Sequence, residues 1–343
     1  MTDLTGTTAV DLGIEPAQRP RVHPVARFLG WRLLGGALTW LFASVLIFVS
    51  TELLPGNVIT AVLGRNARPE AVAALRDQLG LNQAIVPRYL DWLKGFVYGD
   101  WGFSSASMAT GNPEKVTHIV SAYGANTLTL AVIAMLILIP LSLFLGTLAA
   151  SRRGWTDHTI VVGSLIAISL PEFVVGTLLI VLFFTVLGLL PPVSLVAPGS
   201  SALSNPRILV LPVLTLLLTN MAWSTRLVRN GTRAELSSDY VRFADLLGFP
   251  RRRLVWRLAL RNGLPVSVQA FALIAQYMLG GIVLTEAVFT YPGLGTALVN
   301  AVIERDIPVV QAIAMVLAAL YIVLNIVADL IVLLLVPRLR TTL

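Results

Sequence analysis

Long stretches without a charged side chain dominate this chain and alternate with short polar segments. A helix that crosses the hydrocarbon core of a membrane needs roughly 20 mostly apolar residues, so the pattern predicts an all-α bundle of membrane-spanning helices. Seven charge-free windows are present, at Leu33–Thr51, Ile119–Ser151, Thr159–Pro171, Phe173–Pro206, Ile208–Thr225, Asn262–Thr285 and Ile307–Ala328.

The composition supports this prediction. Hydrophobic residues make up 56% of the chain, charged residues make up 13%, and the mean hydropathy is +0.81, which excludes a soluble domain with a polar surface. The chain has no cysteine, so disulfides and thiol chemistry are excluded. A pI near 10.2 would suit nucleic-acid binding, but the basic residues flank the apolar windows and therefore indicate membrane topology.

The stretch from Thr159 to Leu189 is interrupted only by Pro171 and Glu172, so it forms either one kinked helix or two short spans. Nine arginines lie between Arg226 and Arg261, and loops this basic stay on the cytoplasmic side. One long helix kinked near Pro171 satisfies this rule, because it gives about six spans with both termini in the cytoplasm. This topology places 17 of the 25 lysines and arginines inside.

The predicted spans divide the chain into a cytoplasmic N-terminal extension, residues 1–27, and a transmembrane domain, residues 28–343. This domain carries an external loop, residues 55–118, and a cytoplasmic loop, residues 226–262. The first apolar window is longer than the core of a signal peptide, so we expect an uncleaved anchor.

The external loop carries two short helical patterns. Residues 70–79 follow a proline and precede a glycine, which suits a helix start and a helix end. Within residues 88–97, the aromatic side chains of Tyr89, Trp92 and Phe96 recur on one helical face. Such a stripe either packs against the scaffold or forms a ligand platform, and packing is the favoured interpretation.

The cytoplasmic loop predicts an amphipathic helix of about nine residues that starts at Asp239 and ends at Gly248. A second, basic helix is expected from Arg251 to Asn262, with Pro265 marking the start of the fifth span. A helix as short as the first is marginal alone, so its apolar face should bind either the lipid surface or a groove on a partner protein. That face consists of Tyr240, Phe243, Ala244 and Leu247.

Several segments, taken in their order and spacing, resemble the permease subunits of ABC importers, specifically the dipeptide, oligopeptide and nickel branch. The segment from Tyr240 to Gly248, with Leu260–Asn262 after it, resembles the cytoplasmic coupling loop of that family. The other segments, between Arg32 and Arg340, are Leu53–Gly56, Tyr89–Gly95, Gly99–Gly102, Thr285–Gly295, Arg305–Gln311, Asn325–Asp329 and Pro337–Arg340.

This resemblance implies a type I importer fold in the bacterial inner membrane and a non-catalytic permease for di- or oligopeptides, with nickel or another small solute as the alternative. The implied partners are a second homologous permease, two ATPase subunits or one fused pair, an extracytoplasmic substrate-binding protein and membrane lipid, without nucleic acid. ATP and magnesium would bind the ATPase subunits, and this chain would hold no cofactor. The residues expected to contact the ATPase are Asp239, Tyr240, Arg242, Phe243, Ala244, Leu247, Gly248 and Arg251.

This sequence departs from the family pattern at Asn57, Arg242, Phe243 and Leu247, where other residue types are usual. The departures at the coupling loop affect which side chains would contact the ATPase.

Other chemistries have little support in the sequence. The only lysines, Lys94 and Lys115, lie outside any phosphate-binding motif, so no nucleotide site is predicted. The three histidines are scattered, so no metal site is predicted. A secondary transporter driven by an ion gradient is the runner-up, although the spans carry only isolated acids. An intramembrane enzyme would need paired catalytic groups, and the spans show none.

Three acids in or near the spans are candidates for the translocation pathway. An ionised group at mid-bilayer costs roughly 2.5–3.5 kcal/mol on insertion scales and therefore usually faces a cavity or a partner. Glu172 follows the Pro171 kink, and our hypothesis is that it lines the cavity and favours a peptide's amino terminus or basic side chains. Glu286 and Asp329 suit either a pathway role or a bridge between helices. Glu52 is expected to be interfacial.

Overall fold

A computed structural model describes residues 24–53, 83–152, 154–196 and 202–335. Helices dominate these residues, and their only β-pairing is one isolated bridge between Phe103 and Lys115. Five helices are long and apolar enough to cross a membrane, and a sharply bent pair brings the number to six if it counts as one span. The predicted all-α membrane bundle is thereby confirmed.

The long apolar helices are α1 (Pro24–Leu53), α6 (Val116–Ser151), α9 (Val210–Leu236), α12 (Leu260–Phe289) and α14 (Ile307–Leu335). The shorter helices are α4 (Ile85–Tyr98), α5 (Ser105–Ala109), α7 (Trp155–Ser169), α8 (Glu172–Ile180), α10 (Asp239–Leu246), α11 (Arg251–Arg253) and α13 (Leu294–Glu304). Two π-helical segments, Val181–Val186 and Leu254–Ala259, extend α8 and join α11 to α12, and 3-10 turns at Ala202–Ser204 and Pro206–Leu209 precede α9.

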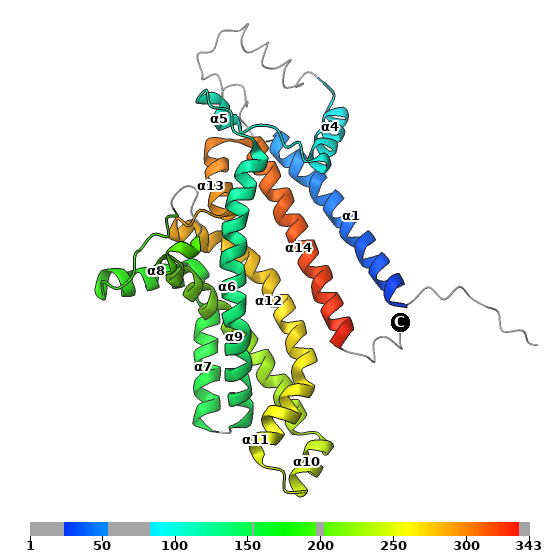
Figure 1. Cartoon of the computed structure of the whole chain (residues 1–343), viewed down its shortest axis with the longest axis vertical. Coiled ribbons are helices and arrows are strands. Elements are labelled where there is room, and N and C mark those ends of the chain that lie inside the picture. Colours follow the sequence, from blue (N-terminus) through cyan, green and yellow to red (C-terminus); the bar gives the residue numbers. More distant parts are fainter. Residues whose placement is uncertain (1–23, 54–82, 153, 197–201, 336–343) are drawn as a thin grey trace, which may run out of the picture.

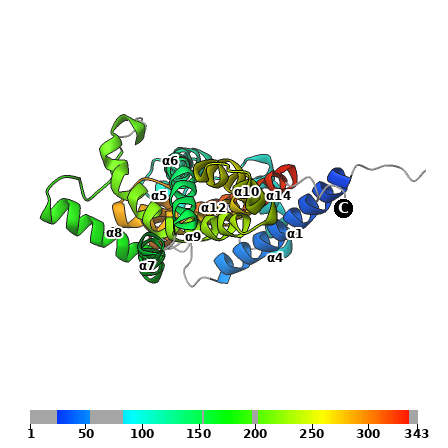
Figure 2. The same cartoon turned by 90° about the horizontal axis from the view of Figure 1, so that it is seen from below.

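The helices form an elongated bundle with two distinct ends (Figure 1). The short helices α4 and α5 gather at one end, together with α13, whereas α10 and α11 lie at the opposite end. At the centre, α9 packs along both α6 and α12, while α1 contacts α14 at the flank (Figure 2). The central helices therefore connect the two ends of the molecule.

Close helix crossings hold the centre together. A Cβ atom at Gly146 of α6 would lie 2.7 Å from the Val228 Cβ atom of α9, so only glycine fits there without displacement. Where α9 crosses α12, a Cβ atom at Gly263 would lie 3.3 Å from the backbone carbon of Gly231. Small residues allow such close backbone approach in membrane bundles. The core around these crossings includes Leu130, Leu138, Leu216, Phe271, Met278 and Ile282.

The prediction of one long helix kinked near Pro171 is wrong. The chain leaves helical conformation at Leu170, whose φ and ψ are −97° and 129°, because a proline disfavours the helical region for the residue before it. A new helix, α8, then starts at Glu172 with Pro171 as its N-cap residue. The two helices meet at an angle of 100°. The segment is therefore broken into two helices rather than kinked.

The expected boundary between a basic helix at Arg251–Asn262 and the fifth span is also wrong. One helical segment runs without a break from Arg251 to Phe289, and Pro265 lies inside it. Local π-helical adjustment and packing against neighbouring helices make proline tolerable inside membrane helices. Both features are present here, at Leu254–Ala259 and at the Gly231 crossing.

The expected packing role of the aromatic stripe in the external loop is confirmed. In α4, the rings of Tyr89 and Trp92 lie 5.5 and 5.4 Å from the ring of Phe48 in α1. Phe96 stacks on Trp101 with a centroid separation of 4.9 Å. Aromatic pairs at these distances stabilise a fold beyond their buried area. The other helix predicted in the external loop, residues 70–79, lies outside the described residues, as do most of the 1–27 extension and Pro337–Arg340.

Candidate functional site

The short helix α10 lies at one end of the bundle, beside the end of α9 and the start of α11 (Figure 1). Ser238 precedes it with extended backbone angles, φ −71° and ψ 153°, as is usual for an N-cap residue. After it, Gly248 has φ +79°, a left-handed conformation that glycine adopts at little cost. The predicted helix starting at Asp239 is confirmed, with a length of eight residues.

Two residues of α10, Val241 and Tyr240, fasten this helix to the bundle. Val241 is 3% exposed. The Tyr240 hydroxyl donates to Glu235 Oε2 at 2.5 Å and accepts from Asn262 Nδ2 at 2.9 Å. Burial and the hydrogen bond to Glu235 raise the pKa of the Tyr240 phenol above its ordinary value, so the hydroxyl stays protonated at neutral pH. These contacts join α10 to the end of α9 and to the start of α12.

The outer side of α10 is apolar and uncovered. Because an α-helix turns by about 100° per residue, positions 240, 243 and 247 lie within about 60° of one another and face away from positions 241 and 245, whereas position 246 follows 242 by four residues and lies at the edge between the two sides. Positions 240, 243, 246 and 247, which we call the outward face, are between 40% and 85% exposed: Tyr240, Phe243, Leu246 and Leu247. Leu246 joins this face although the sequence pattern did not select it, and the predicted Ala244 is half-buried.

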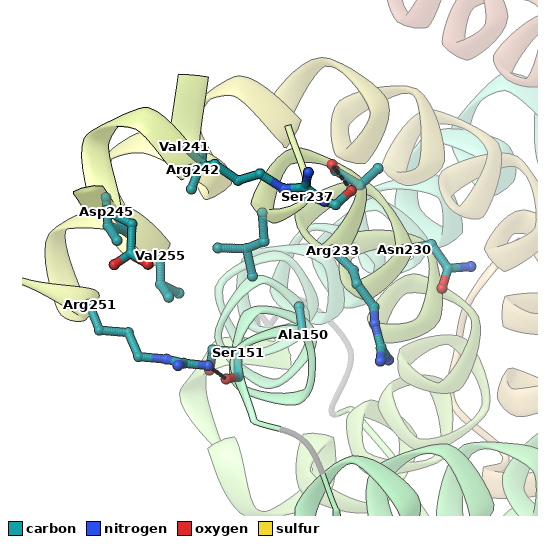
Figure 3. A pocket seen from close by; sticks show the side chains of 13 residues that line it. Ala150, Ser151, Asn230, Arg233, Ser237, Val241, Arg242, Asp245, Arg251 and Val255 are labelled. Atoms are coloured by element: carbon teal, nitrogen blue, oxygen red, sulfur yellow. Dashed lines mark hydrogen bonds between the residues drawn. The ribbon is translucent and has the colours of Figure 1, made fainter. Parts of the chain in front are cut away.

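A cavity of about 720 Å³ lies behind α10, between that helix, the last turn of α6 and the last turns of α9 (Figure 3). We call it the α10 cavity. Arg251 Nη2 donates to the Ser151 carbonyl oxygen at 3.1 Å and so satisfies one of the free carbonyls at the end of α6. The charged residues that line the cavity are Arg233, Arg242, Asp245 and Arg251.

An ion-pair cluster near this end fixes α7 to α9. Arg229 binds both carboxylate oxygens of Asp157, at 2.5 and 2.7 Å, and Arg233 Nη1 donates to the same carboxylate at 3.0 Å. Arg229 and Asp157 are largely buried, and bidentate pairs of this kind are geometrically specific. Sequence reasoning missed this cluster, because its partners lie 72 and 76 residues apart.

Glu172 lies at the start of α8, against α9 and α12. Its Oε1 atom accepts from Thr219 Oγ1 at 3.0 Å and from Asn220 Nδ2 at 3.3 Å. A Cβ atom at Gly281 would overlap its carboxylate, so the group sits directly on the α12 backbone. Among the described residues, no cation pairs with Glu172. Among the described residues, the carboxylate of Glu172 therefore accepts hydrogen bonds only from neutral side chains.

Glu286 is completely buried near the end of α12. One carboxylate oxygen accepts from Thr127 Oγ1 of α6 at 2.7 Å. The other accepts from the backbone N–H of Gly295 at 2.6 Å. Thr127 Oγ1 accepts in turn from the Leu294 N–H at 2.8 Å. This network fastens the turn between α12 and α13 onto α6, and it uses both oxygens of Glu286.

The remaining acids form bridges at the flank of the bundle. Asp329 in α14 pairs with Arg32 in α1 at 2.9 Å. Glu52, near the end of α1, receives two hydrogen bonds from Arg88 in α4, at 2.8 and 2.7 Å. The three acids selected from the sequence, Glu172, Glu286 and Asp329, thus have separate sets of partners.

The sequence matches two related family descriptions. Residues 139–341 match the binding-protein-dependent transport system inner membrane component. Residues 25–112 match the N-terminal part of the membrane component of such systems. The two matches together include α10, the aromatic helix α4 and the membrane-spanning helices other than α6, whose residues 116–138 fall between them.

Several named proteins are similar along nearly their whole length. A probable peptide ABC transporter permease of Sinorhizobium fredii is 31% identical over 90% of this chain and 97% of its own length. The oligopeptide transport system permease protein AppB of Bacillus subtilis is 31% identical, with 87% and 94% covered. The metal-staphylopine import system permease protein CntB of Staphylococcus aureus is also 31% identical, with 86% and 91% covered.

Glu286→Ala is expected to lower the free energy of unfolding by about 2–4 kcal/mol, because the Thr127 hydroxyl and the Gly295 N–H would lose their buried acceptor. Reversible unfolding in mixed detergent micelles measures this change. Glu304→Ala, at an exposed position in α13, is the control and should change stability by less than about 0.5 kcal/mol. Equal stability of the two variants would contradict a structural role for the Glu286 network.

Proposed function

Because this chain belongs to the family of binding-protein-dependent transport system inner membrane components, we propose that it forms half of the translocation pathway of a peptide importer. As a permease subunit of an ABC importer it is a non-catalytic, multi-pass membrane protein, and ATP hydrolysis belongs to separate ATPase subunits. The cargo, the docking site of the ATPase and the orientation in the membrane are proposals with separate support.

Peptide cargo is supported by the names of two similar permeases, one described as a peptide permease and one as an oligopeptide permease. A metal chelate is the second candidate cargo, because an equally identical relative is named a metal-staphylopine import permease. Both kinds of cargo are small solutes, and the extracytoplasmic binding protein would select between them.

The outward face of α10 is the observation that carries the coupling proposal. Three apolar side chains, Phe243, Leu246 and Leu247, are 62% to 85% exposed on a short helix at the end of the bundle, and the ring of Tyr240 beside them is 40% exposed. This apolar surface would be costly to hydrate unless a partner covers it. A groove on an ATPase subunit that receives this helix would bury them, in the helix-in-groove mode of recognition. The proposed contact residues are Tyr240, Phe243, Leu246 and Leu247.

The contacts between α10 and the bundle would transmit a movement of the ATPase to the membrane-spanning helices. Tyr240 joins α10 to Glu235 of α9 and to Asn262 of α12, and both of these helices continue through the central core. Movement of an ATPase subunit that carries α10 would therefore move α9 and α12. We propose that ATP-driven closure of two ATPase subunits is coupled in this way to opening of the pathway.

The arginine distribution supports an orientation with α10 in the cytoplasm. Nine arginines lie between Arg226 and Arg261, and such a bias favours the cytoplasmic side. Both termini would then be cytoplasmic, and α4 and α5 would face the extracytoplasmic binding protein. The complete importer is proposed to contain a second homologous permease and two ATPase subunits, which bind ATP and magnesium.

Phe243→Ala is expected to weaken ATPase binding by about 2 kcal/mol, or roughly 30-fold, because a large aromatic anchor is lost from the interface. Titration of the ATPase subunits onto the permease in nanodiscs measures the affinity. Vanadate-sensitive peptide uptake into proteoliposomes of the complete importer should fall with it. Trp155→Ala is the matched control, since this aromatic side chain is 84% exposed in α7 and lies outside the outward face. Unchanged affinity in Phe243→Ala would overturn the coupling proposal.

Glu172 is the acid that we propose to act on the cargo. Its carboxylate is held by two neutral donors and has no cationic partner among the described residues. A carboxylate within an apolar bundle is stabilised when a cation approaches it. The amino terminus of a peptide, or a basic side chain, supplies such a cation. Glu286 and Asp329 already have partners, which supports bridging roles for them.

Glu172→Gln should reduce uptake of cationic peptides about 5- to 30-fold relative to N-acetylated neutral peptides, as expected for the loss of about 1–2 kcal/mol of charge pairing. Glutamine retains an oxygen that can accept from Thr219, so the local packing should persist. Competition uptake with paired peptides measures the ratio, and Glu52→Gln serves as the control that leaves it unchanged. An unaltered ratio in Glu172→Gln would remove Glu172 from cargo selection.

A further inference from the structure

The α10 cavity has a charge pattern that the docking of an ATPase does not require, and we propose that this cavity binds a phosphate-type anion. Three arginines and one aspartate line it, Arg233, Arg242, Arg251 and Asp245, which leaves a net charge of +2. This inference concerns the inner side of α10 and would stand even if the ATPase contacted another part of the permease.

The cavity and the outward face use different residues of α10. Positions 241, 242 and 245 line the cavity, whereas none of positions 240, 243, 246 and 247 does. A ligand in the cavity would therefore leave the outward face free. The two sites can be occupied at the same time, and α10 would lie between them.

The cationic groups around the cavity are incompletely neutralised. Asp157, which lies outside the lining, is shared between Arg229 and Arg233. Arg251 donates to a neutral carbonyl oxygen of Ser151. Arg242 makes no ion pair with any residue that the structure describes. Clustered arginines repel one another, and an anion that accepts several hydrogen bonds from them removes that repulsion.

The guanidinium groups that line the cavity favour a phosphate group as its ligand. Arginine presents a planar set of donors that matches phosphate geometry, and the arginines here come from α9, α10 and α11. Figure 3 shows Arg242 and Arg251 on separate elements around the cavity, with Arg251 reaching the end of α6 at Ser151. Because Arg233 and Arg251 already donate to Asp157 and to the Ser151 carbonyl, a phosphate in the cavity would pair first with Arg242, and the other two side chains would have to turn toward it.

Two sources can supply this chemistry. The cavity includes Ala150 and Ser151, the last residues of the apolar span Val116–Ser151. An anionic lipid at this end of the bundle would present a headgroup phosphate of the kind that arginines bind. Free phosphate in the surrounding solution presents the same kind of anionic acceptor oxygens. In either case the bound anion would fix the position of α10 relative to α6 and α9. The outward face, which α10 carries, would then move less relative to the bundle.

The test uses the full chain in two settings. In detergent without phospholipid, inorganic phosphate is titrated at constant ionic strength against chloride, and thermal unfolding reports binding. In nanodiscs that contain phosphatidylglycerol and phosphatidylcholine, native mass spectrometry after mild detergent release reports retained phosphatidylglycerol. The proposal expects saturable stabilisation by phosphate, selective retention of phosphatidylglycerol, or both, and the setting that responds identifies the source.

Three variants assign the signal to the cavity. Arg242→Gln should weaken anion binding about tenfold, because a charge-assisted hydrogen bond is lost. Asp245→Asn should strengthen binding several-fold, because it removes the one acid from the lining. Arg252→Gln is the matched control: it removes the same charge from α11, and Arg252 does not line the cavity.

The opposite signs of the Arg242→Gln and Asp245→Asn effects separate anion binding from a general loss of stability, which would move both variants in the same direction. Absence of binding in both settings would overturn the proposal. So would an equal loss in Arg252→Gln and Arg242→Gln, because the signal would then come from nonspecific surface charge.

Discussion

Helix α9 approaches α6 and α12 at glycines, where backbone lies almost against backbone. At Gly146 of α6 a Cβ atom would come within 2.8 Å of the Thr225 carbonyl oxygen, and at Gly263 of α12 within 3.3 Å of Gly231. Dispersion contacts at such crossings hold membrane helices together, since lipid provides no hydrophobic force between them. The same helix carries Thr219 and Asn220, which hold Glu172, and Arg229, which holds Asp157. The positions of α7, α8 and α10 all depend on α9.

The contacts with α9 and α12 determine the position of the short helix α10. Buried Val241 and the hydrogen bonds of the Tyr240 hydroxyl join it to α9 and α12, whereas Phe243, Leu246 and Leu247 of the outward face are 62% to 85% exposed. A helix of eight residues has little stability of its own, so these inner contacts set its position. The helix is therefore suited to transmit a displacement from a docked ATPase into the membrane, and an anion in the α10 cavity would make that link more rigid.

Local patterns in the sequence predicted the features that depend on local spacing. The apolar windows located the spans, and Asp239, Gly248 and the residues between them located α10. The aromatic spacing of Tyr89, Trp92 and Phe96 located the packed face of α4. The pattern did not predict contacts between distant segments. Glu286 meets Thr127 across 159 residues, and nothing in the spacing near either residue indicates the other. The pattern also did not predict the 100° bend at Pro171. The distribution of arginines indicates whether the number of membrane crossings is odd or even, and it carries no information about the angle between two helices.

Site-specific cross-linking from the outward face tests the coupling claim most directly. The chain has no cysteine, so Leu246→Cys, at a side chain of α10 that is 85% exposed, creates a single attachment point in this chain for a short photoreactive maleimide. In the assembled importer, illumination should give an adduct of this chain with an ATPase subunit, and Val97→Cys, exposed on α4, should give none. Absence of an ATPase adduct from Leu246→Cys, or equal adducts from both positions, would contradict the account of α10 as the coupling helix.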